Sequence, residues 1–78
     1  MIFNHMAIFA AIANEGSFTQ AAKVTGIPKS TVSLKLKELE SQLGVRLIHR
    51  TTRQLTLTEH GQQFYQQCQQ LVNLAENA

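Results

Sequence analysis

Hydrophobic residues recur at helical spacing near the start of the chain. Phe3, Met6 and Ala10 lie three or four positions apart, and further apolar residues widen this stripe over residues 2–14. A stripe of this width predicts an amphipathic helix with a broad buried face. Gly16 follows closely, and because glycine commonly terminates helices, we expect the first helix to end near it.

Two more helical patterns follow, separated by a short turn. A helix over residues 17–24 opens with Ser17 and Gln20 at capping-box spacing, and its expected buried contacts are Phe18, Ala21, Ala22 and Val24. After the turn "TGI", Pro28 suits the start of a helix over residues 29–43. The apolar stripe of that helix consists of Val32, Leu36, Leu39 and Leu43. Two helices joined by a short glycine-containing turn are what a helix-turn-helix requires.

The hydrophobic period changes after Gly44. Short runs rich in β-forming residues predict a hairpin that pairs residues 46–50 with 54–57, with the polar "TTR" between them. Thr58 is a suitable N-cap for a last helix over residues 59–78. Its apolar stripe contains Phe64, Cys68, Leu71, Val72 and Ala75, and Tyr65 and Leu74 broaden it. This helix shows no stop signal, so we expect the 78 residues to belong to a longer chain.

The positive charge of the chain is concentrated in its middle. The net charge is only +2, but the segment 23–53 holds all seven Lys and Arg residues against two Glu residues. A compact basic segment is typical of a protein that binds an anionic partner, most often nucleic acid. On charge alone, a solvated charged face explains the pattern equally well.

Composition and spacing exclude several other functions. Seventy-eight residues allow one small domain, in which an enzyme with a deep substrate pocket is not expected. No apolar run approaches the ~18 residues that cross a bilayer, and the lone Cys68 cannot form an internal disulfide, so we expect a cytoplasmic protein without membrane contact. The histidines and Cys68 lack metal-ligand spacing, so neither metal nor cofactor is expected. His5 is interpreted as a core-edge residue.

The helix over residues 29–43 has a polar and cationic outward face. At about 100° per residue, the positions away from the apolar stripe are Ser30, Ser33, Leu34 and Lys37, with Lys29 and Thr31 at the N-terminal end. A helix N-terminus favours phosphate, and such a helix fits the DNA major groove. The two arginines and two threonines of residues 50–53 suit a wing that contacts the minor groove or phosphates. The alternative is a solvent-exposed helix that happens to begin with good N-terminal residues.

Three motifs in order carry a family resemblance: "GSFTQAA" (16–22), "LESQLGVRLIHR" (39–50) and "LTLTEHG" (55–61). With them, the chain resembles the N-terminal DNA-binding domain of LysR-type transcriptional regulators. The resemblance implies a mainly α fold: a winged helix-turn-helix of three helices and a two-stranded β-hairpin wing over residues 1–58, then a long linker or dimerisation helix over 59–78. A larger effector-binding domain would normally follow, and a small-molecule effector is expected only for that domain.

The same resemblance assigns roles in binding double-stranded DNA. Base-edge contacts are expected from Lys29, Ser30, Ser33 and Leu34, and DNA-backbone contacts from Thr31 and Lys37. Groove or phosphate contacts of the wing are expected from Arg50, Thr52 and Arg53, and flanking phosphate contacts from Ser17, Thr19 and Gln20. The family usually opens its recognition helix with Ser-Gln-Pro or a similar triplet, where this chain has Pro28-Lys29-Ser30. Leucine cannot donate to guanine, so Leu34 is expected to contact thymine methyl groups or no base.

The last helix allows two interpretations. Its stripe could pack only on the first helix, but the stripe is wider than one neighbour covers, which favours a homodimer. The dimerisation residues would be Phe64, Tyr65, Cys68, Leu71, Val72 and Ala75. A twofold dimer would present two recognition helices to the half-sites of a pseudo-palindrome. A rival function is a winged-helix module that binds protein, which would need no basic wing tip.

Overall fold

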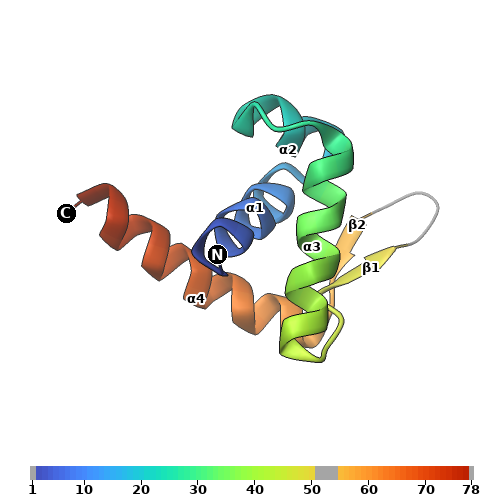
Figure 1. Ribbon diagram of the computed structural model, residues 1–78. Coiled ribbons are helices and arrows are strands. Elements are labelled where there is room, and N and C mark those ends of the chain that lie inside the picture. Colours follow the sequence, from blue (N-terminus) through green and yellow to red (C-terminus); the bar gives the residue numbers. More distant parts are fainter. Residues whose placement is uncertain (1, 51–54, 78) are drawn as a thin grey trace.

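Four helices and a two-stranded sheet make up the computed structural model, which describes residues 2–50 and 55–77 (Figure 1). The elements are α1 (Ile2–Glu15), α2 (Phe18–Thr25), α3 (Lys29–Leu43), β1 (Ile48–Arg50), β2 (Leu55–Leu57) and α4 (Glu59–Asn77). The mainly helical fold with a two-stranded wing is confirmed, and α3 has the bounds that the sequence predicts. Within the described residues, no helix combines the length and apolarity needed to cross a membrane.

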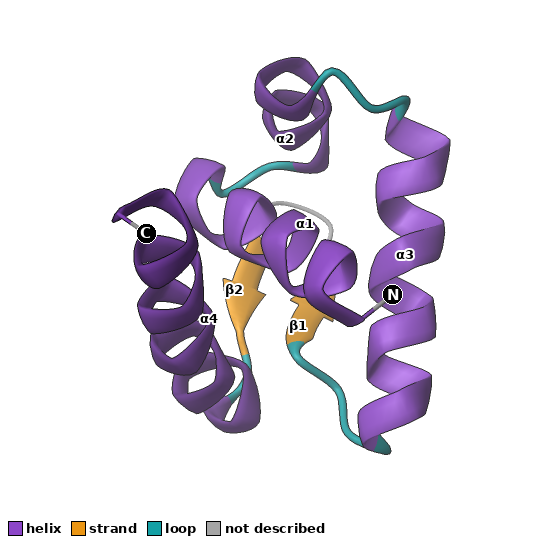
Figure 2. Ribbon diagram, turned by 60° about the vertical axis from the view of Figure 1, so that its left-hand side comes forward, coloured by secondary structure: helices purple, strands orange, loops and turns teal. Residues whose placement is uncertain are grey.

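Helix α1 lies at the centre of the domain and carries much of the core. Figure 2 shows α1 between α3 and α4 with the sheet behind it, and α2 also packs on α1. The broad apolar face predicted for residues 2–14 is therefore shared among three helices. The buried hydrophobic side chains are Met6, Ile8, Phe9, Ala10, Ile12, Ala21, Val32, Leu36, Leu39, Leu47, Ile48 and Cys68.

The turn between α2 and α3 is held by local hydrogen bonds. Gly26 caps α2 in the left-handed conformation with φ 72°, which favours glycine, and its N–H donates to the Ala22 carbonyl at 2.9 Å. The Thr25 hydroxyl donates to the Ala21 carbonyl at 2.7 Å and accepts from the Ile27 N–H at 3.3 Å. These bonds fix the direction in which α3 leaves the turn.

Two expectations about burial are wrong. Val24 was expected in the core, but its side chain is 60% exposed. It lies about 110° around α2 from the stripe of Phe18, Ala21 and Ala22, and Thr25 takes the stripe position in that turn. Leu43 was expected in the buried stripe of α3 but is exposed, because it is the last residue of the helix and lies at the rim of the core.

The predicted hairpin forms, and its first strand begins at Ile48 instead of residue 46. β1 and β2 pair antiparallel, with Ile48 opposite Leu57 and Arg50 opposite Leu55. Ile48 is fully buried and Leu57 half-buried, so the pair joins the hairpin to the helical core. The expected wing contacts Thr52 and Arg53 lie outside the described residues.

Candidate nucleic-acid interface

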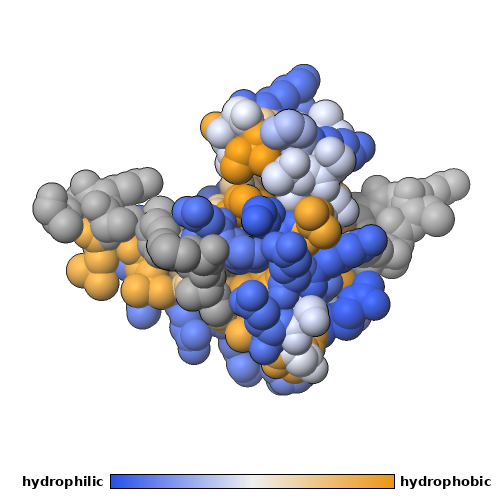
Figure 3. Space-filling view, in the orientation of Figure 1, coloured by the Kyte–Doolittle hydropathy of each residue, from blue (hydrophilic) through white to orange (hydrophobic). Residues whose placement is uncertain are grey.

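The two sides of α3 differ as the sequence predicts. Val32, Leu36 and Leu39 are fully buried against the rest of the domain. The residues expected at DNA lie at or near the surface: Lys29, Ser30, Leu34 and Lys37 are exposed, and Thr31 and Ser33 are half-buried. Leu34 is 53% exposed, so this apolar side chain extends into solvent. In Figure 3, most of the surface over α3 is hydrophilic.

The N-terminus of α3 is open to an anion. Pro28 occupies the N-cap position and makes no side-chain cap hydrogen bond, and the first helical bond runs from Val32 N to the Pro28 carbonyl at 3.0 Å. The backbone N–H groups of residues 29–31 therefore have no partner within the helix. Together with the exposed ammonium of Lys29, they form a positive helix end suited to phosphate.

The start of α2 adds polar groups. The Ser17 hydroxyl accepts from the Gln20 N–H at 3.2 Å, which confirms the serine half of the predicted capping box. The hydroxyl group can also donate a hydrogen bond of its own to a phosphate oxygen. Thr19 and Gln20 are exposed in the first turn of α2. Arg50 lies at the end of β1, where the strand leads into the loop of the wing.

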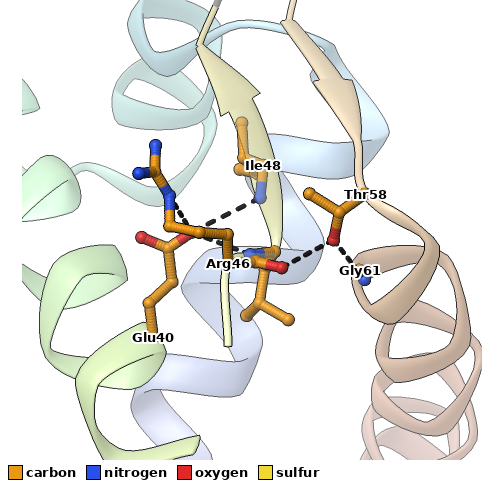
Figure 4. Close-up of polar contacts among 6 residues, drawn as sticks. Glu40, Arg46, Ile48, Thr58 and Gly61 are labelled. Carbon is orange, nitrogen blue, oxygen red and sulfur yellow. Dashed lines mark hydrogen bonds and ion pairs between the residues drawn. The ribbon is translucent and has the colours of Figure 1, made fainter. Parts of the chain in front are cut away.

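A buried carboxylate, which the sequence analysis missed, joins α3 to the wing. Glu40 is only 9% exposed, and its Oε2 accepts hydrogen bonds from Leu47 N at 2.8 Å and Ile48 N at 3.4 Å (Figure 4). The Arg46 guanidinium lies 3.8 Å from the same oxygen. A sequence signal existed, since Glu40 lies four residues after Leu36 and hence beside the apolar stripe, where a charged side chain needs partners.

The start of α4 is fixed to the same segment. The Thr58 hydroxyl accepts from Gly61 N at 2.9 Å, as predicted for an N-cap, and donates to the Arg46 carbonyl at 2.6 Å (Figure 4). Thr58 N also donates to the Leu47 carbonyl at 3.0 Å. Gly61 lies so close to the Leu47 backbone that a Cβ there would be 2.9 Å from the Leu47 carbonyl carbon. Residues 46–48 are thus held between α3 and α4.

A second polar cluster ties α1 to the middle of α3. His5 is buried, as its interpretation as a core-edge residue requires, and its Nε2 donates to Glu38 Oε1 at 2.8 Å. The Lys35 ammonium lies 3.6 Å from that oxygen. The hydrogen bond from His5 and the charge of Lys35 hold the pKa of Glu38 below its ordinary value. Lys35 is therefore held at the flank of α3 that faces α1, away from Lys37.

Helix α4 divides into a packed half and an exposed half. Phe64 packs against Phe9 with ring centroids 5.7 Å apart, and the Tyr65 hydroxyl bonds to Asn14 on α1. Farther along, Leu71 is 43% and Leu74 68% exposed. In Figure 3, apolar side chains gather over this C-terminal half of α4. The expected dimerisation residues Val72 and Ala75 lie in the same half, but their side chains are outside the described set.

Cys68 was expected among the dimer contacts, and its burial contradicts this expectation. Its side chain is fully buried in the core of its own chain, so it presents no surface to a partner. Burial raises the pKa of its thiol to about 11. The thiol is therefore protonated at neutral pH and poorly nucleophilic, as expected of a small hydrophobic core residue and not of a redox group at an interface.

The sequence of the chain matches a family of bacterial regulators over most of its length. Residues 3–62 match the family described as bacterial regulatory helix-turn-helix protein, lysR family. An HTH-type transcriptional regulator of Xanthomonas campestris pv. campestris (strain 8004) is 47% identical over 75 residues, which cover 96% of this chain and 22% of that protein. PtxR, an HTH-type transcriptional regulator of Pseudomonas aeruginosa, is 40% identical over 75 residues, which cover 24% of its length. The chain thus spans about a quarter or less of these relatives.

Solved structures agree with the sequence comparison. The crystal structure of the BenM DBD in complex with catB site 1 DNA superposes with a TM-score of 0.94 at 32% identity, covering 99% of this chain and 86% of that one. The CbnR DBD–DNA complex gives a TM-score of 0.90 at 30% identity, covering 99% of this chain and 88% of that one. Both similar structures contain DNA.

Proposed function

Because the chain belongs to the lysR family of bacterial regulatory helix-turn-helix proteins, whose members are transcriptional regulators and not enzymes, we propose that it binds specific double-stranded DNA through α3. The observation that supports this most directly is the division of α3. Its inner stripe is fully buried, while hydroxyl and ammonium groups remain at the surface around an uncapped N-terminus. An α-helix of this kind can enter the major groove and read base edges.

The proposed contacts divide by position. At the major groove we place Lys29, Ser30, Ser33 and Leu34 on base edges, with Thr31 and Lys37 on the backbone. Ser17, Thr19 and Gln20 would bind the flanking phosphates. The wing would contact the adjacent minor groove or phosphates through Arg50, Thr52 and Arg53. The division into a DNA-binding unit over residues 1–58 and a linker helix over 59–78 stays a prediction, as does an effector-binding domain outside this chain.

The test is equilibrium binding of the 78-residue chain to fluorescent duplexes at about 50 and 200 mM salt. Duplexes selected by the chain from a random pool should bind roughly a thousandfold more tightly than unselected ones, and both affinities should fall as salt rises. The rival function, a module that binds protein, predicts neither selection nor a steep dependence on salt. Absence of both would refute DNA binding by this chain.

We further propose that the chain acts as a twofold dimer through the C-terminal half of α4. Leu71 and Leu74 expose apolar surface there, while Phe64, Tyr65 and Cys68 pack within the chain. A twofold axis near this half would place two α3 helices on a pseudo-palindromic site. Burial of these leucines against a second copy would provide the apolar contact that stabilises the dimer.

Leu74→Glu should therefore weaken the dimer. A carboxylate would have to be buried in an apolar contact, so we expect the dimer dissociation constant to rise about 10- to 100-fold. Sedimentation equilibrium measures it directly. The control is Asn73→Glu, which adds the same side chain on an exposed position about 100° around the helix from Leu74 and about 160° from Leu71, and should leave association nearly unchanged. Equal effects of both substitutions would argue against this interface.

A further inference from the structure

We propose that Glu40 is a positioning residue for DNA binding, whose buried carboxylate sets the direction of the wing strands β1 and β2 relative to α3. Through that direction, Glu40 would determine the preference for base pairs that flank those contacted by α3. The inference rests on the DNA-binding function proposed above and assigns to Glu40 a role in it.

The contacts of Glu40 reach from α3 to the first residues of the wing. Its Oε2 accepts from Leu47 N at 2.8 Å and Ile48 N at 3.4 Å, and β1 begins at Ile48. Bonds from backbone N–H groups to a carboxylate are stronger than those to a neutral acceptor. The Glu40 side chain is 10% exposed, so water competes little for these bonds. One side chain of the recognition helix therefore fixes where the strand starts.

The opposite side of the same segment is fixed to the start of α4. The Arg46 carbonyl accepts from the Thr58 hydroxyl at 2.6 Å, and the Leu47 carbonyl accepts from Thr58 N at 3.0 Å. In the segment 46–48, the N–H groups of Leu47 and Ile48 are thus bonded to α3, and the carbonyls of the first two residues are bonded to Thr58 at the junction of β2 and α4. Loss of the Glu40 bonds would leave the wing attached to α4 but no longer aligned with α3.

A direct role of Glu40 at DNA is excluded by its charge and its contacts. The carboxylate is negative, would repel phosphate, and is already bonded to the backbone and close to Arg46. Its effect on base preference must therefore pass through the placement of the wing. A wing that is free to tilt would still contact DNA, but it would no longer distinguish the width or shape of the adjacent groove.

The test compares sequences selected from a random duplex pool by four chains: wild type, Glu40→Gln, Glu40→Asp and Glu38→Gln. Gln keeps the side-chain length and one acceptor oxygen but removes the charge. Asp keeps the charge, but its side chain is shorter by one methylene group, so the carboxylate cannot reach the same N–H groups. Glu38→Gln is the matched control, because it removes the same charge from α3 at a residue that bonds His5 and not the wing. Circular dichroism and thermal unfolding of each chain are measured in parallel.

We expect both Glu40 variants to keep the base preferences of α3 and to lose preference at the flanking positions by roughly five- to tenfold. Glu38→Gln should keep the wild-type pattern at every position. If Glu40→Asp kept the wild-type pattern while Glu40→Gln and Glu38→Gln lost preference to the same extent, the loss would follow from charge alone and the positioning role would be refuted. Equal loss at all positions, as a purely structural defect would give, also refutes it. If the wild type itself selects no sequence, the proposed DNA binding fails, and this inference with it.

Discussion

Gly61→Ala should destabilise the domain by about 3 kcal/mol or more, although alanine normally favours a helix. Gly61 lies in the first turn of α4 at ordinary helical angles, where Gly→Ala would by itself stabilise by about 1 kcal/mol. Here a Cβ would be 2.9 Å from the Leu47 carbonyl carbon and 3.3 Å from its Cα. Both are backbone atoms, and the Leu47 carbonyl is also bonded to Thr58 N, so this contact cannot be relieved by a side-chain rotation.

Urea and thermal unfolding measure this effect, and a loss of 3 kcal/mol corresponds to roughly 12 to 24 °C in Tm for a domain of this size. The matched control is Gln62→Ala in the same turn, an exposed position where the change should be within about 0.5 kcal/mol. A Gly61→Ala chain as stable as wild type would mean that α4 does not approach Leu47 this closely.

The double variant Lys29→Ala/Lys37→Ala should lose about 100-fold in DNA affinity at ~0.1 M salt. Both ammonium groups are exposed on α3, one at its N-terminus and one two turns later, and each is proposed to lie at DNA. Removal of Lys37, which is placed on the DNA backbone, should also lower the slope of log affinity against log salt by about one, while removal of Lys29, which is placed on base edges, should mainly lower the affinity. Binding isotherms at four or five salt concentrations give both quantities.

Lys35→Ala provides the control for this experiment. Lys35 lies on the same helix, and its substitution removes the same ammonium group. That ammonium is 3.6 Å from the Glu38 carboxylate, on the flank that faces α1. We expect a much smaller loss of affinity and little change in slope. If Lys35→Ala weakened binding as much as the double variant, the face of α3 assigned to DNA would be wrong.

Most of the fold follows from local signals in the sequence. Pro28 and Gly44 delimit α3, since proline fits only the first turn of a helix and Gly44 adopts the left-handed conformation that ends one. The buried stripe of α3, apart from its predicted last member, follows from helical periodicity because these residues meet the same core. Lys29, Ser30 and Lys37 lie at the surface because they are on the side of the helix away from that stripe.

The features that the sequence analysis missed depend on partners far along the chain. Nothing local shows that Glu40 would bond to Leu47 and Ile48, although its place beside the apolar stripe indicated burial. The packing role of Gly61 is not visible in the sequence, because only the fold brings Leu47 against it. Val24 was placed in the core because it is apolar, although α2 offers only one narrow face to α1. In each case, tertiary contacts determine the burial and the partners of the residue, which the local sequence pattern does not determine.

The burial of Cys68 supplies a built-in probe of motion. It is the sole cysteine of the chain, and it lies on α4 in the core. An alkylating reagent can reach this sulfur only when α4 separates from α1 or the whole domain opens. The rate of alkylation therefore reports how often the domain opens, in free protein or on DNA, without any label having to be introduced.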